Sequence, residues 1–126
     1  MTGVYIKGEI MPKTTENILK HYSGLNDDEF VKQIRDFEKA AVGIIDATIN
    51  IKNLKENENG DYVISSLCKN YVLAKMYEHI AHTDYIDLAS DLMVDFRESL
   101  RRIKDSQTDN NISSDENRRV FSLYIK

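Results

Sequence analysis

Two histidines and a glutamate lie close together in the stretch Glu78-His79-Ile80-Ala81-His82. Residues three apart on a helix share a face, so His79 and His82 are spaced to share a metal ion. The zinc-protease pattern differs, because its histidines are four apart and its glutamate directly follows the first of them. The spacing indicates no third ligand, so we predict solvated histidines at a helix end, where they complement the helix dipole. A metal-dependent helical enzyme using His79, His82 and nearby acids is one alternative, which elemental analysis would detect.

An acidic row follows these histidines. Its members recur at steps of three and four residues and are Asp84, Asp87, Asp91 and Asp95. Paired carboxylates serve in acid-base catalysis and in magnesium binding. That chemistry needs a concave and partly dry site, and nothing in the spacing demands one. We interpret the row as the solvated acidic face of a helix, because carboxylates are rarely buried without partners.

The most compact basic cluster lies further along the same pattern. It consists of Arg97, Arg101, Arg102 and Lys104. It is a candidate charged contact with phosphate or with an acidic partner. The alternative is that these cations complement the negative end of their own helix.

No residue pattern in the chain predicts catalysis. The single cysteine, Cys68, lies in an apolar helical pattern and is predicted to be a packed, inert thiol rather than a nucleophile. The sequence has no glycine-rich phosphate loop and no nucleophile elbow. We therefore expect no catalytic residues, no metal and no cofactor.

Composition narrows the class of protein further. The chain has 126 residues, of which 41% are hydrophobic and 30% are charged, which suits one small domain with a single core. A net charge of -4 is a poor basis for sequence-specific DNA binding, which usually shows a basic face. No apolar run approaches the roughly 20 residues that cross a bilayer. We expect a soluble intracellular protein without a membrane segment.

Apolar residues recur at helical spacing through most of the chain, which predicts an all-α fold. We expect a small four-helix bundle with a long antiparallel helical hairpin and extended N- and C-terminal arms. The first helix starts at a threonine cap at Thr14 and ends at Gly24, and the second runs from Asn26 to near Asn50. The third and fourth helices are capped by Asp61 and Asp84 and form the hairpin. Residues 52–61 are predicted to be an exposed loop.

The predicted organisation has three parts: an N-terminal arm at residues 1–13, a helical bundle at 14–104 and a flexible tail at 105–126. The polar stretch 105–119 cannot bury enough surface to become ordered. It tethers a β-branched and aromatic segment that should pack on a partner, either its own fold or the sheet edge of another chain. We predict that it is a docking strand for another chain. Its partner-binding residues are Val120, Phe121, Ser122, Leu123, Tyr124 and Ile125.

Two stretches carry a resemblance to a known family. They are Tyr-Val-Leu-Ala-Lys-Met-Tyr-Glu-His at residues 71–79 and Leu-Met-Val-Asp-Phe-Arg-Glu-Ser-Leu-Arg-Arg-Ile at residues 92–103. Together with the order of the predicted helices, they resemble the head-tail connector proteins of long-tailed bacteriophages, which are also called adaptor or head-completion proteins. The resemblance covers residues 14–103 and is best at 71–79 and 96–103. The internal loop is shorter than in some members.

The resemblance implies a structural virion protein and not an enzyme. Such proteins form a homo-oligomeric ring of about a dozen copies under the portal protein. The ring extends the DNA channel and docks the tail or a stopper protein, so its location is the virion neck after assembly in the host cytoplasm. DNA passes through without sequence-specific binding, and no membrane is involved. The alternative is a small regulatory or scaffolding helical protein that binds one cellular partner.

Overall fold

The computed structural model of the chain describes residues 6, 9–56 and 59–114, with side chains described up to residue 108. Within these residues the only regular secondary structure is helical, which confirms the predicted all-α helical bundle. The helices are α1 (Lys13–Ser23), α2 (Asp27–Thr48), α3 (Ile51–Lys55), α4 (Gly60–Ile80) and α5 (Thr83–Ser114). The described part therefore has one helix more than the four predicted, because α3 forms inside the expected loop.

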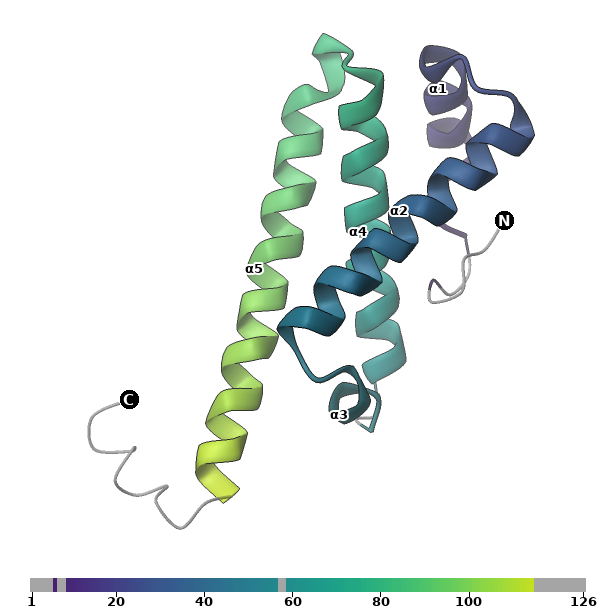
Figure 1. Ribbon diagram of the computed structural model, residues 1–126. Coiled ribbons are helices and arrows are strands. Elements are labelled where there is room, and N and C mark those ends of the chain that lie inside the picture. The colour runs from purple at the N-terminus through teal and green to yellow at the C-terminus, as the bar shows by residue number, and fades with distance from the viewer. Residues whose placement is uncertain (1–5, 7–8, 57–58, 115–126) are drawn as a thin grey trace.

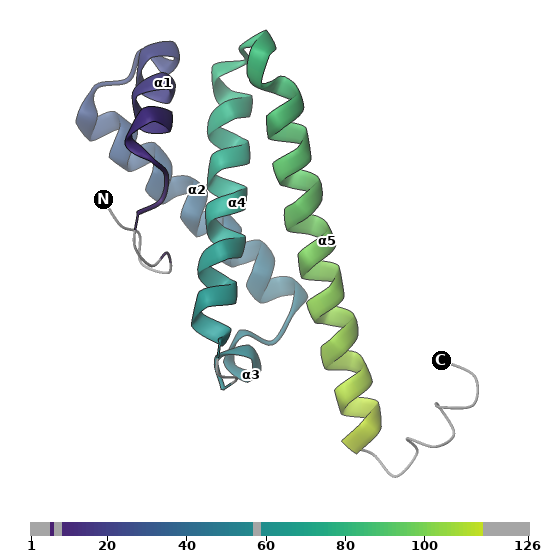
Figure 2. The ribbon, with the colours of Figure 1, turned by 180° about the vertical axis from the view of Figure 1, so that it is seen from behind.

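Helices α4 and α5 form the predicted antiparallel hairpin, and their mutual contact is the largest between any two elements. Helix α2 crosses this hairpin obliquely and meets α5 near its own C-terminal end (Figure 1). Seen from behind, α1 lies beside α4 on the side away from α5 (Figure 2). Helix α4 thus contacts all four other helices, which explains why apolar residues cover so much of its surface.

The caps at the N-terminal half of the chain follow local rules. Gly24 ends α1 with a left-handed φ of 71°, as predicted, and its N–H donates to the Lys20 carbonyl oxygen. The predicted threonine cap is wrong, because α1 begins one residue earlier and Pro12 occupies the N-cap without a side-chain hydrogen bond. Asn26 caps α2 as predicted. Its side chain accepts a hydrogen bond from the Glu29 N–H, and the Glu29 carboxylate accepts one from the Asn26 N–H. Each side chain thus pairs with a backbone N–H that has no partner within the helix.

The two aspartate caps predicted for the hairpin are also wrong. Asp61 lies in the first turn of α4, whose N-cap is Asn59. Asp84 likewise lies in the first turn of α5, and it donates its backbone N–H to Nδ1 of His82 at 3.1 Å. Ala81 takes a left-handed φ of 52°, which turns the chain so that the His82 ring reaches this helix end.

The predicted exposed loop at 52–61 contains a short helix. Asn50 caps α3 by accepting from the Asn53 N–H, and Leu54 is buried against the core. Gly60 is buried where α4 begins, and a Cβ at this position would overlap the Leu54 carbonyl oxygen. The loop prediction was wrong here because one buried leucine is enough to dock a short helix, and one leucine gives no periodicity.

The core is continuous from the N-terminal segment to α5. Phe30, Ile34, Ile64, Val72 and Phe96 are among its fully buried side chains. Three residues of the predicted arm belong to the core as well, since Ile6, Ile10 and Met11 are buried.

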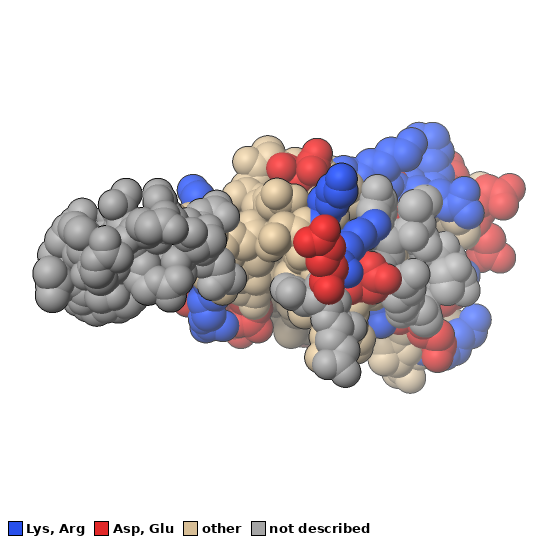
Figure 3. All heavy atoms as spheres, turned by 90° about the horizontal axis from the view of Figure 1, so that it is seen from below, with Lys and Arg blue, Asp and Glu red and all other residues tan. Residues whose placement is uncertain are grey.

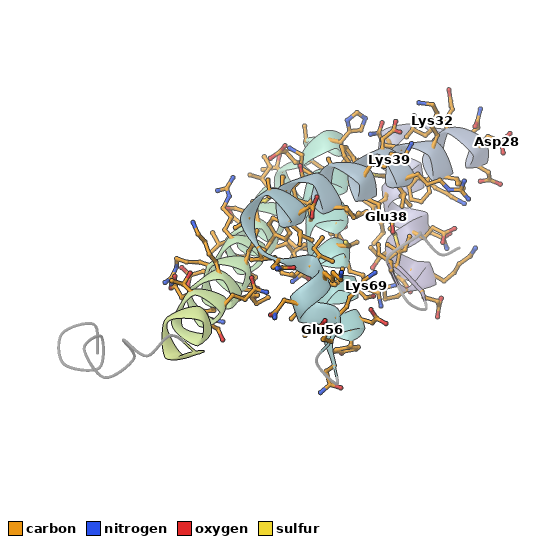
Figure 4. The ribbon with its side chains drawn as sticks, turned by 60° about the horizontal axis from the view of Figure 1, so that its bottom comes forward. Asp28, Lys32, Glu38, Lys39, Glu56 and Lys69 are labelled. Carbon is orange, nitrogen blue, oxygen red and sulfur yellow. The ribbon has the colours of Figure 1, made fainter. Side chains whose placement is uncertain are left out.

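One acidic side chain is buried beside this segment. Glu38 is only 3% exposed, and its Oε2 accepts from the Ile6 N–H at 3.2 Å. Figure 4 shows Glu38 on the inner side of α2, whereas Lys32 and Lys39 lie on its outer side. The carboxylate therefore ties the N-terminal segment to α2.

Helix α5 is longer than predicted. The apolar pattern stops at Lys104, yet the helix continues to Ser114. Gln107 accepts from the Asn50 N–H at 2.8 Å and donates to the Asn50 carbonyl oxygen at 2.9 Å. Polar contacts with the α2–α3 turn therefore hold a helical turn that apolar spacing does not predict. The predicted docking strand at 120–125 lies outside the described residues.

Candidate functional site

A groove of about 430 Å³ opens where α2 crosses the hairpin. The last turns of α2, the middle of α4 and the middle of α5 form its three sides, and Figure 1 shows these segments meeting. The groove exists because α2 runs obliquely, so that its C-terminal turns cover only part of the hairpin. It therefore combines residues from three helices that are distant in sequence.

The floor of the groove is apolar. The Tyr71 and Phe96 rings, one from each hairpin helix, lie 5.1 Å apart between centroids at a tilt of 57°. Met93 and Leu100 continue this floor along α5, and Ile44 forms the α2 wall. Phe96 and Leu100 are buried, whereas Ile44 is 39% exposed. An exposed isoleucine beside buried aromatics leaves apolar surface in water.

Four cations stand around this floor, namely Lys75, Arg97, Arg101 and Lys104. Lys75 pairs with Glu78 at 3.2 Å, and Arg101 pairs with Glu98 at 3.5 Å and Asp105 at 3.4 Å. Arg97 and Lys104 make no ion pair with any described side chain. The rim therefore keeps net positive charge that can pair with an acidic group.

The structure places three of the four predicted basic residues in this rim. Arg102 does not line the groove, and it pairs with Glu98 at 3.8 Å instead. The alternative, that these cations stabilise the negative end of their own helix, does not account for the cluster. Helix α5 ends at Ser114, and the dipole acts only within the last turn. The sequence did not indicate Ile44, Tyr71 and Lys75 as site residues, since no spacing rule connects α2, α4 and α5.

The two histidines have different surroundings. His79 is exposed, as predicted. His82 is only partly solvated, because its side chain is 30% exposed and its ring packs against those of Tyr22 and Tyr85, with centroid distances of 4.3 Å and 5.5 Å. Its Nδ1 is already engaged as the cap of α5. No three His, Cys, Asp or Glu side chains of the described residues are grouped so that they could hold a metal ion.

The predictions for the acidic row and the cysteine are confirmed. Asp84, Asp87, Asp91 and Asp95 are all exposed on α5. Cys68 is fully buried, and this burial, together with the nearby Glu38 carboxylate, raises the pKa of its thiol to about 12. A neutral thiol without access to solvent is not a nucleophile.

The remaining surface has mixed charge. Seen from below, Lys and Arg are interspersed with Asp and Glu over the described residues (Figure 3). Of the helices that the structure describes, none has the length and apolar character that crossing a bilayer requires. Comparison of the chain with models of protein families, with curated proteins and with solved structures found no match.

Proposed function

We propose that this chain is a head-tail connector of a long-tailed bacteriophage, a structural protein that assembles as a ring under the portal. One observation carries the proposal. The two stretches that resemble this family, residues 71–79 and 92–103, are separate in sequence but meet at the groove. Tyr71 and Lys75 come from the first stretch, and Phe96, Arg97 and Leu100 come from the second. The residues behind the resemblance thus build one recognition surface.

The chemistry of the groove supports recognition rather than catalysis. An apolar floor with a charged rim is the arrangement of a protein–protein interface, and arginine and aromatic residues are enriched there. The side chains lining the groove include no carboxylate, imidazole or thiol. The groups commonest in acid-base and nucleophilic catalysis are therefore missing from this groove, whose titratable side chains are lysines, arginines and one tyrosine.

Charge supports the proposed role in the DNA channel. The net charge of the chain is -4. An acidic surface lets DNA slide past, because tight binding needs many cationic phosphate contacts. The apolar residues 120–125 are suited to adding a strand to another polypeptide, in this proposal the portal or a neighbouring subunit.

The test is binding to the portal protein encoded beside this chain. We expect the full chain and the portal to form one complex in light scattering, with added density under the portal ring in electron micrographs. Failure to bind that portal would overturn the proposal. Binding to a single cellular protein as a monomer or dimer would support the regulatory or scaffolding alternative.

The C-terminal segment gives a sharper version of this test. Removing residues 115–126 leaves α5 complete to Ser114, so circular dichroism should show an unchanged helical content. We expect the truncated chain to lose its binding to the portal. A matched variant keeps the length but replaces the five aliphatic and aromatic residues Val120, Phe121, Leu123, Tyr124 and Ile125 with serine, and it should also fail to bind. Full binding by both variants would contradict the docking role of this segment.

A further inference from the structure

We propose that the groove binds the acidic first half of α5 of a second copy of this chain. The contact runs head to tail, so each copy offers its acidic half to the groove of the next. This would be the subunit contact of the ring and in that sense rests on the proposed function. The contact itself is a property of the isolated chain and is tested without a portal.

The surface that enters the groove is the first half of α5. Residues 83–96 include no lysine or arginine, and the row Asp84, Asp87, Asp91 and Asp95 is exposed. Three large aliphatic side chains of the same half are in water, with Ile86 52%, Leu88 40% and Val94 51% exposed. By helical spacing Leu88 and Val94 lie beside the acidic row, whereas Ile86 lies on another face of α5.

The exposed aliphatic side chains connect the two surfaces. The described residues have four large aliphatic side chains that are clearly exposed: Ile44, Ile86, Leu88 and Val94. The first lies in the groove wall, and the other three lie on the acidic half of α5. Contact between the two surfaces would remove Ile44, Leu88 and Val94 from water, which is the main driving force for association.

Charge and length also match. The groove has the four cations Lys75, Arg97, Arg101 and Lys104, and the acidic row has four carboxylates. At the rise of an α-helix, Asp87 to Asp95 spans about 12 Å, and Arg97 to Lys104 spans about 10 Å. The row can therefore lie along the rim with its carboxylates near the cations. Arg97 and Lys104, which pair with no described side chain, gain acidic partners.

The C-terminal segment of the chain is a poorer occupant. Residues 115–126 contain Arg118, Arg119 and Lys126 against Asp115 and Glu116. A segment with this balance gains little from a basic rim. Residues 83–96 of α5 have no lysine or arginine that the basic rim would repel.

The two surfaces overlap along the length of α5, since Met93 and Phe96 line the groove, but they lie on different faces of the helix. The acidic row faces solvent, whereas the groove opens beside α2. A copy that fills its neighbour's groove still has its own groove open for another copy. Such a heterologous contact repeats from copy to copy and closes into a ring or continues as a filament.

The experiment is sedimentation velocity of the full chain over a wide range of concentration. We expect a concentration-dependent increase in mass that weakens as salt is raised, because salt screens the charges. The double variant Arg97→Glu/Lys104→Glu should lower the association constant by about a hundredfold or more, since like charges then face each other. The variant Asp91→Lys/Asp95→Lys should do the same from the other side.

Rescue separates this contact from general damage. Mixing the two double variants restores opposite charges across the contact, so the mixture should associate although neither variant does alone. A chain that carries all four substitutions should associate with itself again. The matched control Lys32→Glu/Lys39→Glu changes two cations on the outer side of α2 and should associate like the original chain. Circular dichroism checks that each variant is folded.

Three results would overturn the contact: a wild-type chain that stays monomeric at every concentration, double variants that still associate, or a mixture that shows no rescue. The portal experiment tests the connector proposal independently of this contact. Folded, monomeric charge variants that still form rings on the portal would overturn this contact and leave the connector proposal standing. A chain that self-associates through the groove but does not bind the portal would overturn the connector proposal and leave this contact standing.

Discussion

The buried thiol makes the stability of the protein depend on alkaline pH. Cys68 is fully buried in α4, and its pKa is raised from the ordinary 9.0 to about 12, mainly because burial disfavours the thiolate. Between these two values the folded chain keeps a proton that the unfolded chain releases. The stabilisation that the protonated thiol gives to the fold is therefore fully present below pH 9 and is lost as the pH rises from 9 to about 12.

The size of the effect follows from the two pKa values. At about pH 10.5 the unfolded state gains about 2 kcal/mol from ionising its thiol, whereas the folded state gains almost nothing. That is a large part of the roughly 5–15 kcal/mol that stabilises a typical domain. Tyrosines and lysines also titrate in this range, so the wild-type curve alone cannot isolate the cysteine.

The assay compares the chain with Cys68→Ala by urea unfolding at about pH 8 and about pH 10.5. The tyrosine and lysine contributions are common to both chains, and only the wild type carries the thiol. We expect the stability difference between the two chains to shift by about 2 kcal/mol against the wild type at the higher pH. A difference that stays constant would refute the reasoning, because it would mean that the folded and unfolded thiols ionise alike.

Three further substitutions test particular contacts. Gly60→Ala should destabilise the fold by about 1–3 kcal/mol in urea unfolding, because the new Cβ overlaps the Leu54 carbonyl oxygen; an unchanged midpoint would argue against this close approach. Phe96→Ala should cost about 3–5 kcal/mol, because the ring is 2% exposed, whereas the exposed Val94→Ala should change stability by less than about 0.5 kcal/mol. Gln107→Ala removes three hydrogen bonds to Asn50 and Asn53, so amide exchange should become faster after residue 104; equal exchange rates would show that these bonds do not hold the helix.

Local features of the sequence predict most of the bundle. Helix α2 has both a capping box at Asn26 and a continuous apolar stripe, and Gly24 marks the end of α1. The break around His82 predicts the hairpin. Each of these features depends on residues within one or two turns of each other, so spacing and cap chemistry are sufficient evidence.

The differences between prediction and structure arise where distant segments decide the outcome. Helix α3 forms because Leu54 is buried, and a single apolar residue in a polar stretch has no period. The end of α5 is held by Gln107, whose partner Asn50 is 57 residues away. The groove likewise depends on the crossing of α2, which brings Ile44 to the side of Arg97. Such contacts are tertiary, and no rule based on neighbouring residues predicts them.

The extra length of α5 changes the meaning of its charges. With a helix that ends at Lys104, acids early and bases late would simply complement the helix dipole. The helix instead continues to Ser114, so Arg97 lies near its middle, where the dipole contributes little. Arg97 and Lys104 also pair with no described side chain, although they flank exposed apolar surface. Since neither the dipole nor ion pairs within the described residues account for these two cations, a partner with acidic and apolar groups does so best, and the first half of α5 in a second copy has that chemistry.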